Sequence, residues 1–224
     1  MTRQIETVQQ VADYVPDPER KLFSATPEEI EQGLTTDIYF VKTKEILTKL
    51  QLTDTVVVAE IFGRRDGIFA GMEEAKNLLQ DLGLEVWSLP EGTPFSAKEV
   101  VMRITGPYVQ FGIYETAILG ILASSSGWET AAHTAKEAAD GRPILCFGAR
   151  HVHPAVAPVM ERAAIIGGAD GASCILGAKL ANQEPAGTVP HALFLIVGDT
   201  LEAAAAYNEF MPAQSVRSML VDTF

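Results

Sequence analysis

The sequence has little of what marks secreted, membrane-spanning or nucleic-acid-binding proteins. Only two of its 224 residues are cysteine, and no CxxC pair or cysteine–histidine spacing accompanies them, so we expect no protein-bound metal. No run approaches the roughly 20 consecutive apolar residues that a membrane-spanning helix needs. The first residues also lack the apolar core of a secretory signal. We therefore expect a cytoplasmic protein that does not bind membranes.

Positive charge is also scarce. Lys and Arg number 17 against 29 Asp and Glu, which gives a net charge of −12 and argues against nucleic acid as a partner. Apolar residues make up 47% of the chain and charged residues 21%, as in an ordinary globular protein. The length allows one large domain or two small ones.

The order of apolar patterns predicts an α/β protein in successive parts. Residues 1–25 are polar and contain Pro and Asp, and we interpret them as an arm. Residues 26–112 predict an α+β sandwich with a mostly antiparallel sheet, because "DTVVVAEIFG" and "KEVVMRITGPY" read as strands. Residues 113–142 predict one long, Ala-rich connecting helix with a bend at "SSSGW".

Two helix boundaries are expected within the sandwich. Thr26 or Ser24 followed by Pro27 and acidic residues is typical of a helix start. The segment "GMEEAKNLLQDLG" has apolar residues at helical spacing and should end at Gly83.

Residues 143–224 predict the first part of an α/β barrel. Short strands are expected at "ILCFGAR", "GGADG", "PAGTVPH" and "SMLVDTF", with helices between them, the first opened by Pro154. Repeated βα units imply parallel strands with right-handed crossovers. In such a barrel, reactive groups gather at the carboxyl ends of the strands.

His191 stands where "PAGTVP" meets the apolar run "HALFLIV". A lone histidine is more often a hydrogen-bonded residue at the end of a core element than a reactive group. If "PAGTVP" is a strand, however, the alternation predicts a helix that starts at His191, where free backbone N–H groups favour anions. Both interpretations stay open on the residues alone.

Five motifs follow one another along the chain: "TTDIYF", "LPEGTPF", "ITGPYVQFGIYETAILGIL", "FGARHVHPAVAPVMERAAIIGGADGASCILGAKL" and "GTVPHAL". Together, and in this order, they resemble the nicotinate phosphoribosyltransferase family, in its shorter microbial branch. The resemblance implies a type II phosphoribosyltransferase: an N-terminal α/β sandwich, a barrel, and a homodimer or higher homo-oligomer with shared active sites. Its members join nicotinate to phosphoribosyl pyrophosphate, with ATP as a co-substrate and Mg²⁺ accompanying the phosphates.

The resemblance also implies roles for particular residues. His191 matches the histidine that takes the γ-phosphate of ATP. The predicted nicotinate-binding residues are Tyr39, Phe147, Arg150 and Asp170, with Tyr39 reaching in from the neighbouring subunit. The predicted phosphoribosyl pyrophosphate-binding residues are Arg150, Ser173 and Thr188.

The sequence departs from the family at three places. His151 stands where a second Arg is usual, and Ala172 stands where many relatives have Thr, so Ser173 becomes the better hydroxyl candidate. The sequence also stops at "LVDTF", where we expect relatives to continue through the remaining barrel strands. Two rival functions stay open: a quinolinate phosphoribosyltransferase, which needs no ATP, and a non-catalytic member of the family.

Overall fold

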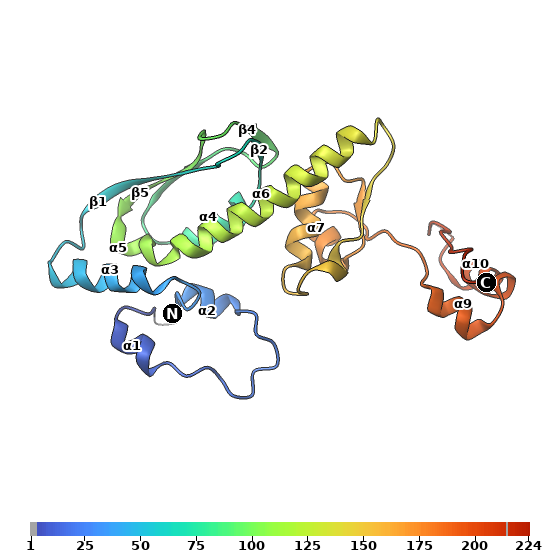
Figure 1. Ribbon diagram of the computed structural model, residues 1–224, viewed down its shortest axis with the longest axis horizontal. Helices are drawn as coiled ribbons and strands as arrows, with labels where there is room; N and C mark the ends of the chain where they lie inside the picture. The colour runs from blue at the N-terminus through green and yellow to red at the C-terminus, as the bar shows by residue number, and fades with distance from the viewer. Residues whose placement is uncertain (1–3, 214) are drawn as a thin grey trace.

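The N-terminal half of the molecule is a layer of antiparallel strands with helices over one face. A computed structural model describes residues 4–213 and 215–224 (Figure 1). The main sheet has the order β1–β5–β3, and two shorter strands, β2 and β4, form a separate ribbon. The strands are β1 (Val56–Phe62), β2 (Gly67–Phe69), β3 (Glu85–Ser88), β4 (Thr93–Phe95) and β5 (Val100–Pro107). All of these pairings are antiparallel, which confirms the predicted sheet type.

The helices of this half follow local sequence signals. They are α1 (Val8–Asp13), α2 (Pro27–Glu31), α3 (Ile38–Lys49), α4 (Met72–Leu79), α5 (Tyr108–Phe111) and α6 (Glu115–Ala138), with a 3-10 turn at Gly112–Tyr114. Thr26 caps α2 in a reciprocal capping box with Glu29, so the predicted helix start is confirmed. The predicted end of α4 at Gly83 is wrong, because the chain leaves the helix after Leu79 and Asp81 adopts a left-handed conformation (φ 65°).

Helix α6 packs its first half into the core of this layer. Strand side chains and one face of α6 form a single buried cluster, which contains Phe69, Ala75, Leu79, Val101, Met102, Ile104, Phe111, Ile113, Tyr114, Ile118 and Leu122. Two hydroxyl groups of α6 also accept hydrogen bonds from backbone N–H groups at the edge of β2. Thr130 Oγ1 accepts one from Ile68 N (2.8 Å), and Ser126 Oγ accepts one from Ala70 N (3.0 Å). These bonds explain why a helix in this position contains so many Ser and Thr residues.

The predicted bend at "SSSGW" is wrong. The helix is continuous from Glu115 to Ala138, 24 residues in all. The Ser124 hydroxyl donates to Gly120 O (2.6 Å) and the Thr130 hydroxyl donates to Ser126 O (2.6 Å), so both are satisfied on the helix's own carbonyls. The hydroxyl groups share these carbonyls with the helical N–H groups, and the helix nevertheless stays continuous.

The second half of α6 packs against a βα arrangement. Strands β6 (Leu145–Cys146) and β7 (Gly171–Ala172) are parallel, with α7 (Ala157–Ile166) between them in the chain and α8 (Ile175–Leu180) after them. The parallel pairing confirms the predicted βα character, and the architecture is α/β as expected. The predicted helix opening at Pro154 is wrong, because α7 begins three residues later, with Pro158 in its first turn.

A close approach joins α6 to α7. A Cβ atom at Gly167, which follows the last residue of α7, would lie 2.4 Å from the backbone oxygen of Glu129. Only glycine fits at this distance. Arg162 adds ion pairs from α7 to Glu91 (2.8 Å) and Glu73 (3.1 Å) in the N-terminal layer.

Two expected strands are absent from the described residues. "PAGTVPH" contributes only one bond to β7, from Ala186 N to Ala172 O (2.8 Å), and "SMLVDTF" pairs with no strand there. A helix does begin at His191, as predicted: α9 (His191–Val197) is followed by α10 (Thr200–Phe210). Gly198 separates them in a left-handed conformation (φ 87°).

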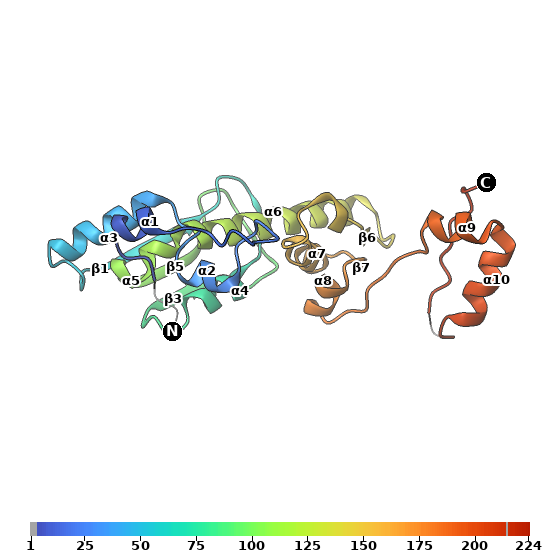
Figure 2. The ribbon, with the colours of Figure 1, turned by 90° about the horizontal axis from the view of Figure 1, so that it is seen from below.

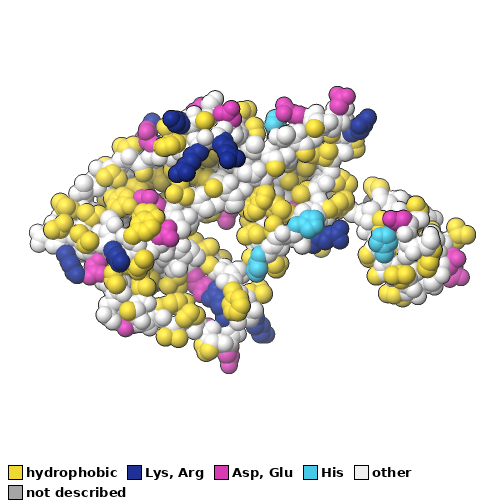
Figure 3. All heavy atoms as spheres, viewed as in Figure 1, with side chains coloured by type: hydrophobic (Ala, Val, Ile, Leu, Met, Phe, Trp, Pro, Cys, Tyr) yellow, Lys and Arg dark blue, Asp and Glu magenta, His cyan; other side chains and the backbone are white. Residues whose placement is uncertain are grey.

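Helices α9 and α10 form a lobe of their own. They pack on each other and lie apart from α7 and α8 in both ribbon views (Figures 1 and 2). The space-filling view shows a narrow neck between this lobe and the rest of the molecule (Figure 3). The neck is the segment 181–190, between the end of α8 and the start of α9.

None of the described helices combines the length and the apolar character that crossing a bilayer requires.

A buried carboxyl without a partner lies where the two halves meet. Glu129 on α6 is fully buried, and neither of its carboxyl oxygens has a hydrogen-bond partner in the described part of the chain. Burial, and then repulsion from Glu91, raise the pKa of Glu129 to about 8, although Arg162 partly offsets the shift. The folded protein therefore holds a proton here at pH values where the unfolded chain has lost it.

We expect the substitution Glu129→Gln to remove a pH-dependent loss of stability. Because the pKa in the folded state is raised, the stabilising contribution is complete below about pH 4.5 and declines as the pH rises through 8. The free energy of unfolding of the unsubstituted protein should therefore fall relative to E129Q by roughly 1–3 kcal/mol between pH 5 and pH 9. Denaturant titrations at pH 5, 7 and 9 measure the difference. Exposed Glu85→Gln is the control, and an equal pH response in E129Q and E85Q would contradict the assignment.

Candidate functional site

Tyr39 is held at the start of α3 by an acidic neighbour. Its hydroxyl donates to Asp37 Oδ2 (3.1 Å), and the same oxygen accepts a bond from the hydroxyl of Thr116 on α6 (3.0 Å). The backbone N–H of Asp37 donates in turn to Thr116 Oγ1 (3.1 Å). The Tyr39 ring stays 55% exposed, so it is fixed in place and still open to a ligand.

The same corner keeps its phenols protonated. Desolvation, and then the hydrogen bond to Asp37, raise the pKa of Tyr39. Desolvation together with the Glu115 carboxylate also raises the pKa of neighbouring Tyr108. Both rings are therefore neutral at physiological pH, which suits stacking against a flat heteroaromatic ring.

A second group of predicted residues lies on the loops after β6 and β7. Phe147 directly follows β6 and is 42% exposed, and Arg150 lies in the 3-10 turn Ala149–His151. Ser173 directly follows β7, and its N–H donates to Cys146 O (3.1 Å). The two loops therefore lie side by side at the carboxyl end of the parallel pair, where the barrel pattern predicts a site. Among the described residues, no carboxylate pairs with the Arg150 guanidinium.

Asp170 lies at the opposite end of the pair. It precedes β7, and its N–H donates to Ile144 O (2.8 Å), just before β6. Its carboxylate contacts Lys136 Nζ (2.6 Å) and accepts a bond from Ile144 N (2.7 Å). These bonds lower the pKa of Asp170, chiefly through Lys136. The structure thus gives Asp170 a structural contact, and its predicted role with nicotinate stays a prediction.

His191 and Thr188 lie away from the β6 and β7 loops. Thr188 is exposed in the neck, and His191 is the first residue of α9 in the separate lobe. The imidazole is half exposed, with Nδ1 3.0 Å from Thr223 Oγ1 and 3.8 Å from Asp222 Oδ1. No hydrogen-bond partner of Nε2 lies among residues 4–213 and 215–224, so this nitrogen is open to a reactant.

The length of α6 keeps Tyr39 away from the loops within one chain. Tyr39 is tied through Asp37 to Thr116, whereas Asp170 is tied to Lys136, twenty positions further along the same helix. At 1.5 Å per residue these two ties are about 30 Å apart. Figure 1 likewise places α3 and α7 toward opposite ends of α6. Tyr39 and the βα arrangement that carries Phe147 therefore lie toward opposite ends of α6.

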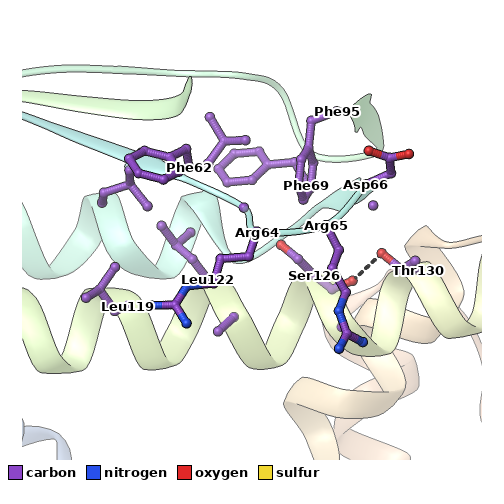
Figure 4. Close-up of a pocket in the computed structure, with 16 residues that line it drawn as sticks. Phe62, Arg64, Arg65, Asp66, Phe69, Phe95, Leu119, Leu122, Ser126 and Thr130 are labelled. Atoms are coloured by element: carbon purple, nitrogen blue, oxygen red, sulfur yellow. Dashed lines mark hydrogen bonds between the residues drawn. The ribbon is translucent and has the colours of Figure 1, made fainter. Parts of the chain in front are cut away.

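A cavity of about 550 Å³ lies between the β1–β2 turn and α6, and it contains none of the predicted site residues. Apolar side chains such as Phe62, Phe69 and Leu122 form most of its wall. Arg64 and Arg65 extend from the turn toward the helix (Figure 4). Small residues on α6, Ala123 and Gly127, leave the space open. Figure 3 shows basic side chains gathered at this opening.

No metal centre is formed by the described residues, in which no three or more His, Cys, Asp or Glu side chains converge.

Three residues that the sequence analysis did not single out organise these groups. Asp37 and Thr116 hold Tyr39, and Glu161 on α7 accepts bonds from Ala149 N (3.1 Å) and the Ser173 hydroxyl (3.0 Å). The position of Asp37 two residues before Tyr39 was a signal within "TTDIYF". Glu161 gave none, because one acid among many on helices cannot be recognised without its partners.

The chain is similar in sequence to known phosphoribosyltransferases. Residues 37–126 match the family model of the quinolinate phosphoribosyl transferase N-terminal domain. The chain is 30% identical over 141 residues to the nicotinate phosphoribosyltransferase pncB2 of Mycobacterium tuberculosis, covering 62% of this chain and 30% of the relative. It is 27% identical over 213 residues to the nicotinate phosphoribosyltransferase of Bacillus subtilis, covering 79% of this chain and 44% of the relative. The chain thus spans less than half the length of these relatives.

Solved structures extend the likeness over nearly the whole chain. A nicotinate-nucleotide pyrophosphorylase from Pyrococcus furiosus superposes with a TM-score of 0.87 and 43% identity, covering 92% of this chain and 54% of that one. The fold is that of the type II phosphoribosyltransferases. Human nicotinic acid phosphoribosyltransferase shares it at 19% identity, with a TM-score of 0.66 over 72% of this chain. These findings show that the chain has the fold of the type II phosphoribosyltransferases.

We expect the Lys136–Asp170 pair to stabilise this phosphoribosyltransferase fold where α6 meets β6 and β7. Asp170→Asn and Lys136→Met should each cause a small decrease in Tm, and the double variant should be no less stable than D170N alone. Because the pKa of Asp170 is lowered, its contribution is present above the pKa of an unfolded Asp and is lost as the pH falls toward and below it.

Thermal melts of the three variants between pH 3 and pH 7 measure this effect. Strictly additive decreases in Tm would mean that the two side chains do not stabilise the fold as a pair. The KM for nicotinate in D170N tests the separate prediction that Asp170 binds the substrate.

Proposed function

We propose that this protein is a nicotinate phosphoribosyltransferase, which forms nicotinate mononucleotide and pyrophosphate from nicotinate and phosphoribosyl pyrophosphate. The observation that carries the choice of substrate is the likeness to two curated proteins of that name. The structure at 43% identity is named for the nicotinate nucleotide, which is the product both of this reaction and of the quinolinate reaction considered below, so this name does not distinguish the two. The reaction would serve NAD biosynthesis by salvage.

We also propose that ATP hydrolysis is coupled through phosphorylated His191. In the tautomer in which Nδ1 donates its hydrogen to Thr223 Oγ1, the lone pair of the ring lies on Nε2. Attack of Nε2 on the γ-phosphorus of ATP forms an N–P bond and releases ADP. Asp222, 3.8 Å from Nδ1, would stabilise the positive charge that the ring carries after attack.

The other predicted residues would bind the substrates. Tyr39 and Phe147 would stack on the two faces of nicotinate, since both rings are exposed and offset stacking suits an electron-poor ring. Arg150, with no carboxylate partner in the described part of the chain, would contact the carboxylate or a phosphate through its planar fork. Asp170 remains a candidate for nicotinate, and Ser173 and Thr188 for phosphoribosyl pyrophosphate.

A site that uses both Tyr39 and Phe147 would need two subunits. The separation of about 30 Å along α6 between the ties of Tyr39 and Asp170 supports this arrangement. In a two-fold dimer, the α3 end of one subunit would face the β6 and β7 loops of the other. We therefore propose a homodimer, or a higher oligomer built from such dimers.

Mg²⁺ would enter the site bound to the phosphate groups of ATP and of phosphoribosyl pyrophosphate. Phosphate oxygens and a few protein oxygens commonly complete its coordination.

A quinolinate phosphoribosyltransferase is the second candidate, favoured by the family model that matches residues 37–126. Such an enzyme decarboxylates a dicarboxylate and uses no ATP, so it would need more basic side chains at the pyridine ring. His151 in place of a second Arg weighs against that need.

We expect the full-length gene product to release pyrophosphate from phosphoribosyl pyrophosphate when nicotinate is added, with stimulation by ATP. It should form an acid-labile, base-stable phosphoryl adduct with γ-labelled ATP. In His191→Ala the adduct and the ATP stimulation should be lost, while slow ATP-independent transfer survives.

The competing outcomes are distinct. Release of CO₂ from quinolinate without ATP would identify the second candidate, and no turnover of either acid would identify a non-catalytic protein. An adduct of equal yield in H191A would exclude His191 as the phosphorylated residue. His133→Ala, on the exposed side of α6, is the matched histidine control.

Mixing two impaired variants tests the shared site. Tyr39→Ala should raise the KM for nicotinate several-fold with little effect on ATP binding, because it removes one stacking face only. Heterodimers of Y39A and H191A subunits should regain one intact site each, and about a quarter of the activity after random mixing. If mixing restores no activity above that of the separate variants, Tyr39 and His191 are supplied to each site by the same subunit.

A further inference from the structure

Glu161 is a fully buried acid that contacts both loops of the predicted site. Its Oε1 accepts hydrogen bonds from Ala149 N (3.1 Å) after β6 and from the Ser173 hydroxyl (3.0 Å) after β7. Its Oε2 accepts a bond from Cys174 N. One side chain on α7 thus joins the two loops from beneath.

The chemistry of these contacts requires a carboxylate. Two of the three partners are backbone N–H groups, which can only donate, and a buried carboxylate is stable only when its oxygens are well supplied with donors. The site is also tightly packed, since a Cβ atom at Gly177 of α8 would lie 3.0 Å from Glu161 Cβ. Neither the carboxylate nor the loops can move without breaking several bonds together.

We propose that Glu161 is a positioning residue: it holds the loop that contains Arg150 and the loop that contains Ser173 in fixed positions relative to each other. Only the identity of the substrate in this proposal rests on the proposed function; the contacts of Glu161 with the two loops do not. Arg162, next in the chain, points instead to Glu91 and Glu73 and holds α7 against the N-terminal layer. Glu161 therefore holds the two loops of the site, whereas Arg162 holds α7 in place.

The contact also fixes what Ser173 offers to a ligand. Because the Ser173 hydroxyl hydrogen is directed to Glu161 Oε1, only the lone pairs of Ser173 Oγ face an incoming group. A phosphate oxygen needs a donor and gains nothing from this hydroxyl. A sugar hydroxyl can donate to it, so Ser173 is assigned to a ribose hydroxyl of the phosphoribosyl substrate.

Glu161→Gln tests the assignment in the full-length gene product. A glutamine amide has one acceptor oxygen, so its NH₂ group must face either Cys174 N or Ala149 N, donor against donor. Amide hydrogen exchange in residues 148–151 and 173–175 should become about ten- to a hundredfold faster. The KM for phosphoribosyl pyrophosphate should rise about tenfold, while kcat and the KM for nicotinate change much less.

Glu129→Gln is the matched control, because Glu129 is equally buried but its carboxyl oxygens have no hydrogen-bond partner in the described residues. E129Q should leave the exchange of both loops and all three kinetic constants unchanged. Ser173→Ala should raise the KM for phosphoribosyl pyrophosphate and leave loop exchange near that of the unsubstituted protein. The KM values of S173A and of the unsubstituted enzyme should also be compared for the 2-deoxyribose and 3-deoxyribose analogues of phosphoribosyl pyrophosphate. For the analogue that lacks the hydroxyl bound by Ser173, the two KM values should be equal.

Unchanged loop exchange in E161Q would overturn the proposal, whatever the activity of the protein. An S173A variant with an unaltered KM for phosphoribosyl pyrophosphate would overturn the ribose assignment. If the unsubstituted protein does not turn over nicotinate, the proposed function fails, and the exchange comparison still decides the role of Glu161. Should E161Q not fold, Glu161→Asp, which keeps the charge but is one methylene too short, should show the same loop-specific exchange.

Discussion

The packing of the two halves of the molecule against each other depends on the contact between Gly167 and α6. At Gly167 there is no room for a side chain, because the main chain of α6 occupies that space. The Arg162 ion pairs to Glu91 and Glu73 and the Lys136–Asp170 pair lie along the same junction. Packing at main-chain distance resists sliding far better than contacts between flexible side chains do. The two halves are therefore held at a fixed separation along α6, which carries the N-terminal core on its first turns and α7 on its later ones.

This junction also accounts for the uncompensated acid within it. Glu129 lies at the residue where α6 and α7 touch, so water is excluded from its carboxyl group. The nearest guanidinium, that of Arg162, is already paired with Glu91 and Glu73. A close joint and a proton retained on a carboxyl group near neutral pH are two results of the same packing.

Local chemistry made several elements of the fold predictable. The capping box at Thr26, the alternation along β1 and the helix from His191 each depend on residues close in sequence. Strands β2 and β4, of three residues each, are too short for a periodic pattern. The expected strands at 185–190 and 218–224 have strand-forming residues, but a strand also needs a partner, and the described residues supply only the bond at Ala186.

The candidate site was predictable only in part, and for a similar reason. Tyr39, Phe147, Arg150 and His191 were found through motifs that a resemblance could interpret. Glu161 could not be found in this way, because its partners are two backbone N–H groups and a hydroxyl that tertiary structure alone brings to it. The Lys136–Asp170 contact likewise joins residues 34 positions apart, which no local pattern reveals.

The neck before α9 limits where His191 can act. Ten residues, 181–190, separate the end of α8 from the start of α9. A fully extended chain of that length spans at most about 35 Å. Any barrel mouth that His191 serves, in its own subunit or in a neighbour, must lie within that radius of Leu180. The length of the neck therefore limits the assemblies of this chain in which His191 can reach an active site.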